Sequence, residues 1–183
     1  MSEIARLSAI VESLLALARA DAGTTPAETI DVPEVARERL EAWRAAARER
    51  DVELSFVADE PASAHASADR VRQVLDNLIA NALDVAPSGS TVTVTVDPAG
   101  PELVVRDEGP GLSDEEKRRA FDRFWRGRAT GTGSGLGLAI ARRLVEADGG
   151  TIVLRDGPDG GLEAVVQLRP AAGSQSSGRR RLI

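Results

Sequence analysis

Residues 131–138, with the sequence GTGSGLGL, place a glycine at every second position immediately before a helix with apolar periodicity. Glycines let backbone N–H groups converge on an anion, and a helix N-terminus adds about half a positive charge. The segment therefore predicts a phosphate-binding site. A flexible linker that precedes a helix is the alternative interpretation.

Two familiar phosphate loops do not fit this segment. A P-loop needs Gly-Lys-Ser or Gly-Lys-Thr, and the only lysine of the chain, Lys117, lies outside it. A dinucleotide-binding GxGxxG motif also fails, because Leu136 and Leu138 stand where its third glycine belongs. A third kind of nucleotide site fits the spacing better.

A second set of candidate residues lies on a helix predicted over residues 68–85. Asn77, Asn81 and Asp84 follow one another at steps of four and three residues, beside the apolar stripe of that helix. Asparagine is a poor helix former, so two of them on one face suggest that their amides serve a ligand. A solvated polar flank is the alternative.

An acidic residue also ends the strand predicted at 103–106. It opens the glycine-rich turn at 107–111, which reads DEGPG. Carboxylates placed just beyond a strand commonly face a pocket, so Asp107 is a third candidate.

The elements that must position these residues alternate between the two structural periods. Helices are expected at 32–50, 68–85, 113–121 and 136–147, and strands at 52–57, 91–96, 103–106, 151–155 and 162–168. An isolated amphipathic helix at 1–23 precedes them, followed by a linker at 24–30. The polar, arginine-tipped end, residues 171–183, is expected to be disordered.

Composition excludes several classes of protein. The chain has 183 residues, of which 42% are hydrophobic, enough for one compact domain with an appendage. Acidic residues outnumber basic ones, 29 to 23, so no nucleic-acid partner is expected. There is no cysteine, hence no disulfide framework, and no apolar run of about 20 residues that would span a membrane. These features indicate a cytoplasmic protein, with any membrane attachment made through segments absent from this chain.

Four segments in order resemble the N, G1, F and G2 boxes of bacterial sensor histidine kinases. They are 76–82 (DNLIANA), 107–111 (DEGPG), 121–126 (FDRFWR) and 133–138 (GSGLGL). The resemblance implies an α+β fold of the Bergerat type, with a mixed sheet of about five strands packed on three helices and a nucleotide held beneath a mobile lid.

The same resemblance divides the chain. Residues 31–170 correspond to the ATP-binding catalytic domain. The isolated helix at 1–23 is similar to the second helix of the dimerization and phosphoacceptor hairpin in that family.

Roles for individual residues follow from the resemblance. Asp107 would accept the adenine amino group, Asn81 would bind Mg²⁺, and Asn77 stands where related ATPases have a glutamate that activates water. The nucleotide-binding positions implied are Asn77, Asn81, Asp107, Gly109, Gly111, Gly133, Ser134, Gly135, Leu136, Gly137 and Leu138.

Two arginines complete the implied catalytic set. Arg123 and Arg126 would place guanidinium groups on the phosphates, and a surface salt bridge is the alternative for each. Asp84 stands where many family members have a lysine or arginine able to reach phosphate. That contact is therefore absent or supplied by the lid.

The implied function is transfer of the ATP γ-phosphoryl group to a histidine. The sole histidine, His65, lacks the flanking motif of a phosphoacceptor, so the acceptor is expected outside this chain. ATP and Mg²⁺ are the implied cofactors. The implied partners are the phosphoacceptor hairpin and homodimer of the full-length kinase, and a response regulator. A regulatory nucleotide-binding module, or a serine kinase like the anti-sigma-factor kinases, is the alternative.

Overall fold

A computed structural model describes residues 26–58, 61–98, 100–126 and 134–171. The helix expected at 1–23 and nearly all of the tail expected at 171–183 lie outside the described residues. The elements are β1 (Glu28–Asp31), α2 (Val32–Arg48), β2 (Glu53–Val57), β3 (Ser63–Ala66), α3 (Ala68–Val85), β4 (Thr91–Asp97), β5 (Glu102–Arg106), α4 (Asp114–Arg119), α5 (Gly137–Ala147), β6 (Thr151–Asp156) and β7 (Leu162–Gln167).

Five strands form one mixed sheet in the order β2-β4-β5-β7-β6. β2 and β4 are parallel, as a crossover through α3 permits, and every other neighbouring pair is antiparallel. The pairs β4–β5 and β6–β7 are hairpins, joined by short turns. The predicted mixed sheet of about five strands is confirmed.

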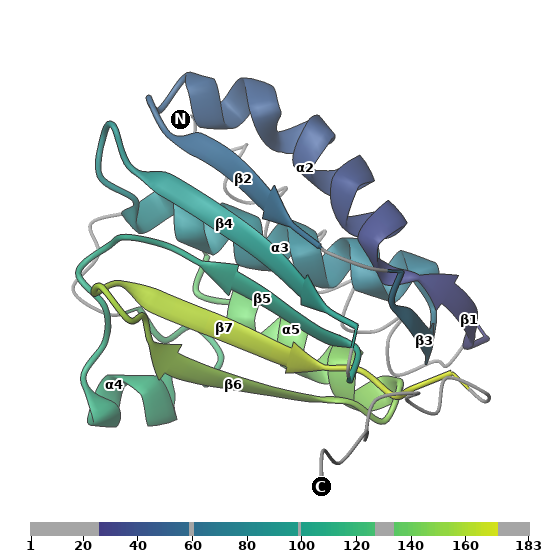
Figure 1. The fold of residues 1–183 in the computed structure, drawn as a ribbon. Coiled ribbons are helices and arrows are strands. Elements are labelled where there is room, and N and C mark those ends of the chain that lie inside the picture. The colour runs from purple at the N-terminus through teal and green to yellow at the C-terminus, as the bar shows by residue number, and fades with distance from the viewer. Residues whose placement is uncertain (1–25, 59–60, 99, 127–133, 172–183) are drawn as a thin grey trace, which may run out of the picture.

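The helices α2, α3 and α5 lie on one face of this sheet (Figure 1). In β4 the valines Val92, Val94 and Val96 are buried against them, and the alternating threonines point to the other face. α3 packs between α2 and α5, and its apolar stripe joins the same core. The molecule is therefore a two-layer α+β sandwich, as predicted.

Side-chain caps fix where three of the helices begin. Asp31 caps α2 and Ser67 caps α3, each accepting a hydrogen bond from the backbone N–H three residues later. α4 begins with a reciprocal capping box between Ser113 and Glu116. None of the described helices has the length and hydropathy that a membrane span requires.

The linker predicted at 24–30 is partly wrong. Glu28–Asp31 is a strand that pairs antiparallel with β3, a strand the sequence pattern did not reveal. Ile30 is buried in this two-stranded sheet and anchors it to the core, so the domain begins before residue 31. His65 lies in β3, opposite Thr29.

A buried ion pair joins the start of α3 to the end of α5. Oδ1 of Asp148 accepts hydrogen bonds from Nε and Nη2 of Arg70, at 3.0 and 2.7 Å. Its Oδ2 accepts the backbone N–H of Ser67 at 3.0 Å. The Asp148 side chain is only 4% exposed, and its charge is paired as a buried carboxylate requires. The contact fixes the position of α3 relative to α5.

Candidate functional site

Asp107 directly follows β5 and is buried, with 5% of its surface exposed. Its Oδ1 accepts the backbone N–H of Gly109 at 2.8 Å, and its own N–H donates to the oxygen of Leu162 at 3.0 Å. Burial raises the pKa of the Asp107 carboxyl above its ordinary value, and hydrogen bonding to the backbone of Gly109 and Leu162 opposes that rise. Such a carboxylate is a strong acceptor for a buried donor.

Asn77 and Asn81 project from α3 toward the start of α5. Nδ2 of Asn77 donates to the backbone oxygen of Gln73 at 2.8 Å. Nδ2 of Asn81 is buried and has no hydrogen-bond partner among the described residues. A buried amide without a partner is costly, which indicates that a ligand completes its hydrogen bonding.

The beginning of α5 comes very close to these two amides. A Cβ atom at Gly137 would lie 3.1 Å from both amide atoms of Asn81 and 3.3 Å from Oδ1 of Asn77. A side chain there would occupy the space beside the amides, so glycine at this position keeps it open.

The part of the glycine loop that the structure describes begins at Ser134, and Gly133 lies outside the described residues. Gly135 has φ of +71° and Phe124 has φ of +65°, and the N–H of Phe124 donates to the oxygen of Gly135 at 2.8 Å. A Cβ at position 135 would lie within 3.0 Å of the backbone of Phe124 and Trp125. Glycine is therefore required there for close packing against the preceding turn.

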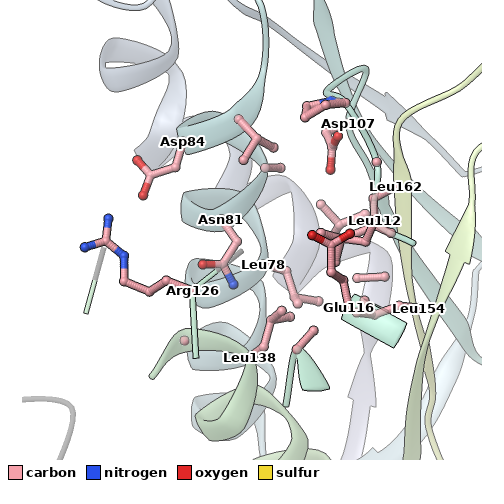
Figure 2. Close-up of a pocket in the computed structure, with 18 of the residues that line it drawn as sticks. Leu78, Asn81, Asp84, Asp107, Leu112, Glu116, Arg126, Leu138, Leu154 and Leu162 are labelled. Carbon is pink, nitrogen blue, oxygen red and sulfur yellow. The ribbon is translucent and has the colours of Figure 1, made fainter. Parts of the chain in front are cut away.

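These elements surround a cavity of about 400 Å³, within the range of small-molecule sites. Figure 2 shows Asp107 at one end and Asn81, Asp84 and Arg126 gathered at the other. Most of the remaining lining is apolar and comes from Leu78, Ala82, Val85, Val105, Leu112, Ala120, Leu138, Leu154, Leu162 and Ala164. The cavity thus has a buried acceptor at one end, charged and amide groups at the other end, and a mainly apolar lining elsewhere.

Seven of the predicted site residues line this cavity: Asn81, Asp107, Gly111, Arg126, Gly135, Gly137 and Leu138. Asn77 adjoins it through Gly137, and Gly109 adjoins it through its bond to Asp107. Ser134 is half-buried and does not line the cavity.

Two predicted positions differ from expectation. Leu136 is fully buried and belongs to the hydrophobic core, so its side chain positions the start of α5 and does not face the cavity. Arg123 and Arg126 are both exposed, and only Arg126 lines the cavity.

The aromatic residues near the loop also differ from one another. Trp125 lines the cavity, and Phe121 packs against the core. Phe124, by contrast, is 60% exposed.

Sequence reasoning missed the wall that α4 contributes. Glu116 lines the cavity, and its Oε2 accepts the N–H and the hydroxyl of Ser113 at 2.9 and 2.7 Å. Lys117 fixes α4 to the end of β6, with Nζ 2.7 Å from Asp156 and 3.1 Å from Asp114. The capping box predicted the helix, but no local signal showed which of its side chains would face a ligand.

The arrangement suits a ligand with a planar amine-bearing base and an anionic tail. A buried carboxylate accepts hydrogen bonds from an amino group, and the leucines provide apolar contact for a flat ring. The guanidinium of Arg126 and the start of α5 favour negative charge at the other end. A purine nucleotide that carries an exocyclic amine meets these demands.

Comparison with known proteins also indicates a nucleotide-binding domain. Residues 66–172, more than half of the chain, match the family of histidine kinase-, DNA gyrase B- and HSP90-like ATPases. The chain is 35% identical to the histidine-protein kinase/phosphatase MprB of Mycolicibacterium vanbaalenii in an alignment of 191 positions, which covers 98% of this chain and 39% of that protein. It is 39% identical to MprB of Mycobacterium leprae in an alignment of 161 positions, which covers 85% of this chain and 30% of that protein.

Solved structures agree in fold. A mycobacterial sensor histidine kinase MprB superposes with a TM-score of 0.66 at 31% identity, covering 79% of this chain and 99% of that one. Full-length ShkA, solved in complex with AMPPNP, has a TM-score of 0.74 at 27% identity, covering 92% of this chain and 37% of that one.

This chain thus spans less than two fifths of the length of the two MprB proteins and of full-length ShkA. The matched family, the relatives and the order of the elements around the cavity agree with one another. The chain belongs to the histidine kinase-, DNA gyrase B- and HSP90-like ATPases, as an ATP-binding domain of the bacterial histidine kinase type.

Proposed function

We propose that this domain binds ATP with its base beside Asp107 and its phosphates beside Asn81 and Arg126. The observation that carries the proposal is the cavity with a buried acceptor at one end and, at the other, an amide without a partner among the described residues. Adenine offers a donor to Asp107 where guanine presents an acceptor, so ATP is preferred over GTP. The complex of the similar ShkA with AMPPNP supports an adenine nucleotide.

We infer that the γ-phosphoryl group passes to a histidine outside this chain. Phosphoryl transfer depends mainly on positioning and on stabilising charge, which the Arg126 guanidinium supplies at the cavity mouth. Asn77 does not take up a proton as a carboxylate would, and its Nδ2 already donates to Gln73. Transfer to a protein acceptor is therefore favoured over hydrolysis by water.

Asn81 is the proposed protein ligand for Mg²⁺. Its amide oxygen is a hard ligand atom of the kind that Mg²⁺ prefers, and the absence of a side chain at Gly137 leaves the amide uncovered on that side. When bound with the triphosphate, the cation neutralises charge on the phosphate oxygens.

We further propose that residues 1–23 contribute to a dimeric phosphoacceptor hairpin in the longer protein, and that a response regulator receives the phosphoryl group. The family membership and the names of the relatives support this assignment. On this proposal the described domain works on the cytoplasmic side of a sensor.

Nucleotide titration tests the binding half of the proposal. Asp107→Asn should weaken ADP binding by about 10- to 100-fold, which corresponds to about 1.5–3 kcal/mol for a hydrogen bond to a charged group. Asp122→Asn, a carboxylate outside the cavity lining, is the matched control and should bind like wild type. Unchanged ADP affinity in Asp107→Asn would refute the adenine assignment.

Radiolabel transfer tests the catalytic half. The isolated chain with γ-labelled ATP should take up almost no label, and it should transfer label when a cognate hairpin carrying its histidine is added. The product should be acid-labile and alkali-stable, as a phosphoramidate is, and Asn81→Ala should transfer far less. An alkali-labile phosphoserine on the hairpin would show instead that the domain is a serine kinase.

A further inference from the structure

Asp84 places a carboxylate at the end of the cavity assigned to the phosphates. It lies one helical turn after Asn81 on α3, and both residues line the cavity. Figure 2 shows Asp84 on the same side as Asn81 and Arg126, away from Asp107. The proposed function leaves this acidic group unexplained.

A carboxylate here is unfavourable for a bare triphosphate. Like charges repel at the short range of a cavity wall, although water screens part of this repulsion because Asp84 is exposed. Asp84 pairs with Arg50, whose Nη2 lies 3.9 Å from Oδ1 of Asp84, a long contact for an ion pair. Arg50 does not line the cavity, so it does not stand between Asp84 and a ligand.

The oxygen atoms of Asp84 and Asn81 suit a hard divalent cation. Carboxylate and amide oxygens are preferred ligands of Mg²⁺, which keeps several waters and takes the rest of its ligands from phosphates. Nδ2 of Asn81 is buried beside Gly137 and has no partner among the described residues, which indicates a ligand that brings an acceptor, such as a phosphate oxygen, to this amide. A cation between Asp84 and the phosphates turns the repulsion into attraction.

We propose that Asp84 forms, together with Asn81, the protein side of the site for the nucleotide-bound divalent cation. The inference rests on the proposed binding of ATP at this cavity. Its consequence is that nucleotide binding is strongly coupled to the cation: Asp84 weakens binding without the cation and strengthens it when the cation is present.

The coupling is measured as the ratio of two dissociation constants for ADP on the full 183-residue chain, one in EDTA and one in saturating Mg²⁺. Asp84→Asn should lower this ratio by about tenfold, with tighter binding in EDTA and equal or weaker binding in Mg²⁺. Loss of the free Mn²⁺ signal in electron paramagnetic resonance provides a direct second readout. Asp84→Asn with ADP should bind Mn²⁺ more weakly than wild type.

Two control variants separate this role from a structural one. Arg50→Gln removes the ion-pair partner of Asp84 and should leave the ratio unchanged, because the partner lies outside the cavity. Asp69→Asn neutralises an exposed carboxylate in the first turn of the same helix and should also leave it unchanged. If Arg50→Gln reproduces the effect of Asp84→Asn, the carboxylate acts through the ion pair and the inference is wrong.

The outcomes also separate this inference from the proposed function. ADP binding by wild type with the same ratio in Asp84→Asn overturns the role of Asp84 alone. No binding of ADP by wild type in either condition overturns both proposals.

Discussion

Gly161 lies so close to Asp107 that a Cβ atom at position 161 would overlap the backbone oxygen of Asp107. Gly161 has φ of +77°, in the left-handed region, and it belongs to the turn between β6 and β7. The backbone N–H of Asp107 also donates a hydrogen bond to the backbone oxygen of Leu162, the residue after Gly161. The turn between β6 and β7 therefore fixes the position of the buried Asp107 carboxylate.

Gly161→Ala should disrupt the contact between this turn and Asp107. The change adds backbone strain of about 1–2 kcal/mol, and the overlap with Asp107 adds a further cost, so both stability and ADP affinity should fall. The neighbouring Gly160 is the matched control, because its φ is +97° but nothing lies within 4 Å of its Cβ position. Gly160→Ala should lose stability through strain and retain ADP affinity. Urea denaturation measures the stability of both variants, and ADP titration measures their affinity. Equal losses of affinity in both variants would contradict the role of the turn in positioning Asp107.

Asp107→Asn should stabilise the domain without nucleotide at neutral pH, although it weakens ADP binding. The pKa of Asp107 is raised in the folded state, so the folded protein takes up a proton at a pH where the unfolded chain is still ionised. Wild-type stability therefore rises as the pH falls through the folded pKa, and is lower above it. The advantage of the neutral asparagine should be largest above that pKa and shrink in acid. Thermal unfolding from about pH 8 to about pH 4 measures it, at about 2–4 °C per kcal/mol. An advantage that does not change with pH would refute the raised pKa.

Gly137→Ala should separate ligand binding from stability. The added Cβ meets the amides of Asn81 and Asn77 at 3.1 and 3.3 Å, which forces both to shift. Helix propensity favours alanine over glycine by up to about 1 kcal/mol, so stability should hold while ADP affinity in Mg²⁺ falls severalfold. Ala139→Gly, two residues further along α5, should show the reverse pattern. Unaltered affinity in Gly137→Ala would show that the amides do not contact the ligand.

Asp148→Ala should be strongly destabilising and leave the cavity chemistry unchanged. Removing one partner of a buried ion pair costs about 3–5 kcal/mol of stability. The Asp148 side chain is 4% exposed and forms such a pair with Arg70. Glu146→Ala is the control, because its pair with Arg142 is exposed and worth less than about 1 kcal/mol. Chemical denaturation measures both variants. ADP affinity of the folded Asp148→Ala protein should match wild type, and a similar loss of stability in the two variants would contradict the role of the buried pair.

Regular elements were predictable because each depends on a local pattern. The alternation of valine and threonine in β4 and the apolar stripe of α3 indicate which side chains are buried. β1 and β3 escaped because each has only four residues, and their pairing depends on a partner more than 30 residues away. Ile30 is a single apolar residue between polar neighbours, so β1 shows no periodic pattern of hydrophobic residues.

The polar residues of the site were predictable, and its apolar lining was not. Asn81 and Asp107 are polar residues at positions where a core would exclude them. Leu154 and Leu162 look like ordinary strand residues, and only the sheet order reveals that they face the cavity. Leu136 is the opposite case, because it stands in the glycine-rich motif and yet its side chain is buried in the hydrophobic core.

The order of the strands also has a consequence for how the domain assembles. The hairpins β4–β5 and β6–β7 each close over a short turn, whereas the central pairing of β5 with β7 joins segments about 60 residues apart. Loop closure over a longer segment costs more entropy, so we expect the hairpins to form early and to dock with each other later. The hydrogen bond between Asp107 and Leu162 forms only when the two hairpins are docked, because it joins the end of β5 to the start of β7. A folding intermediate with both hairpins formed would therefore still lack the end of the cavity that contains Asp107.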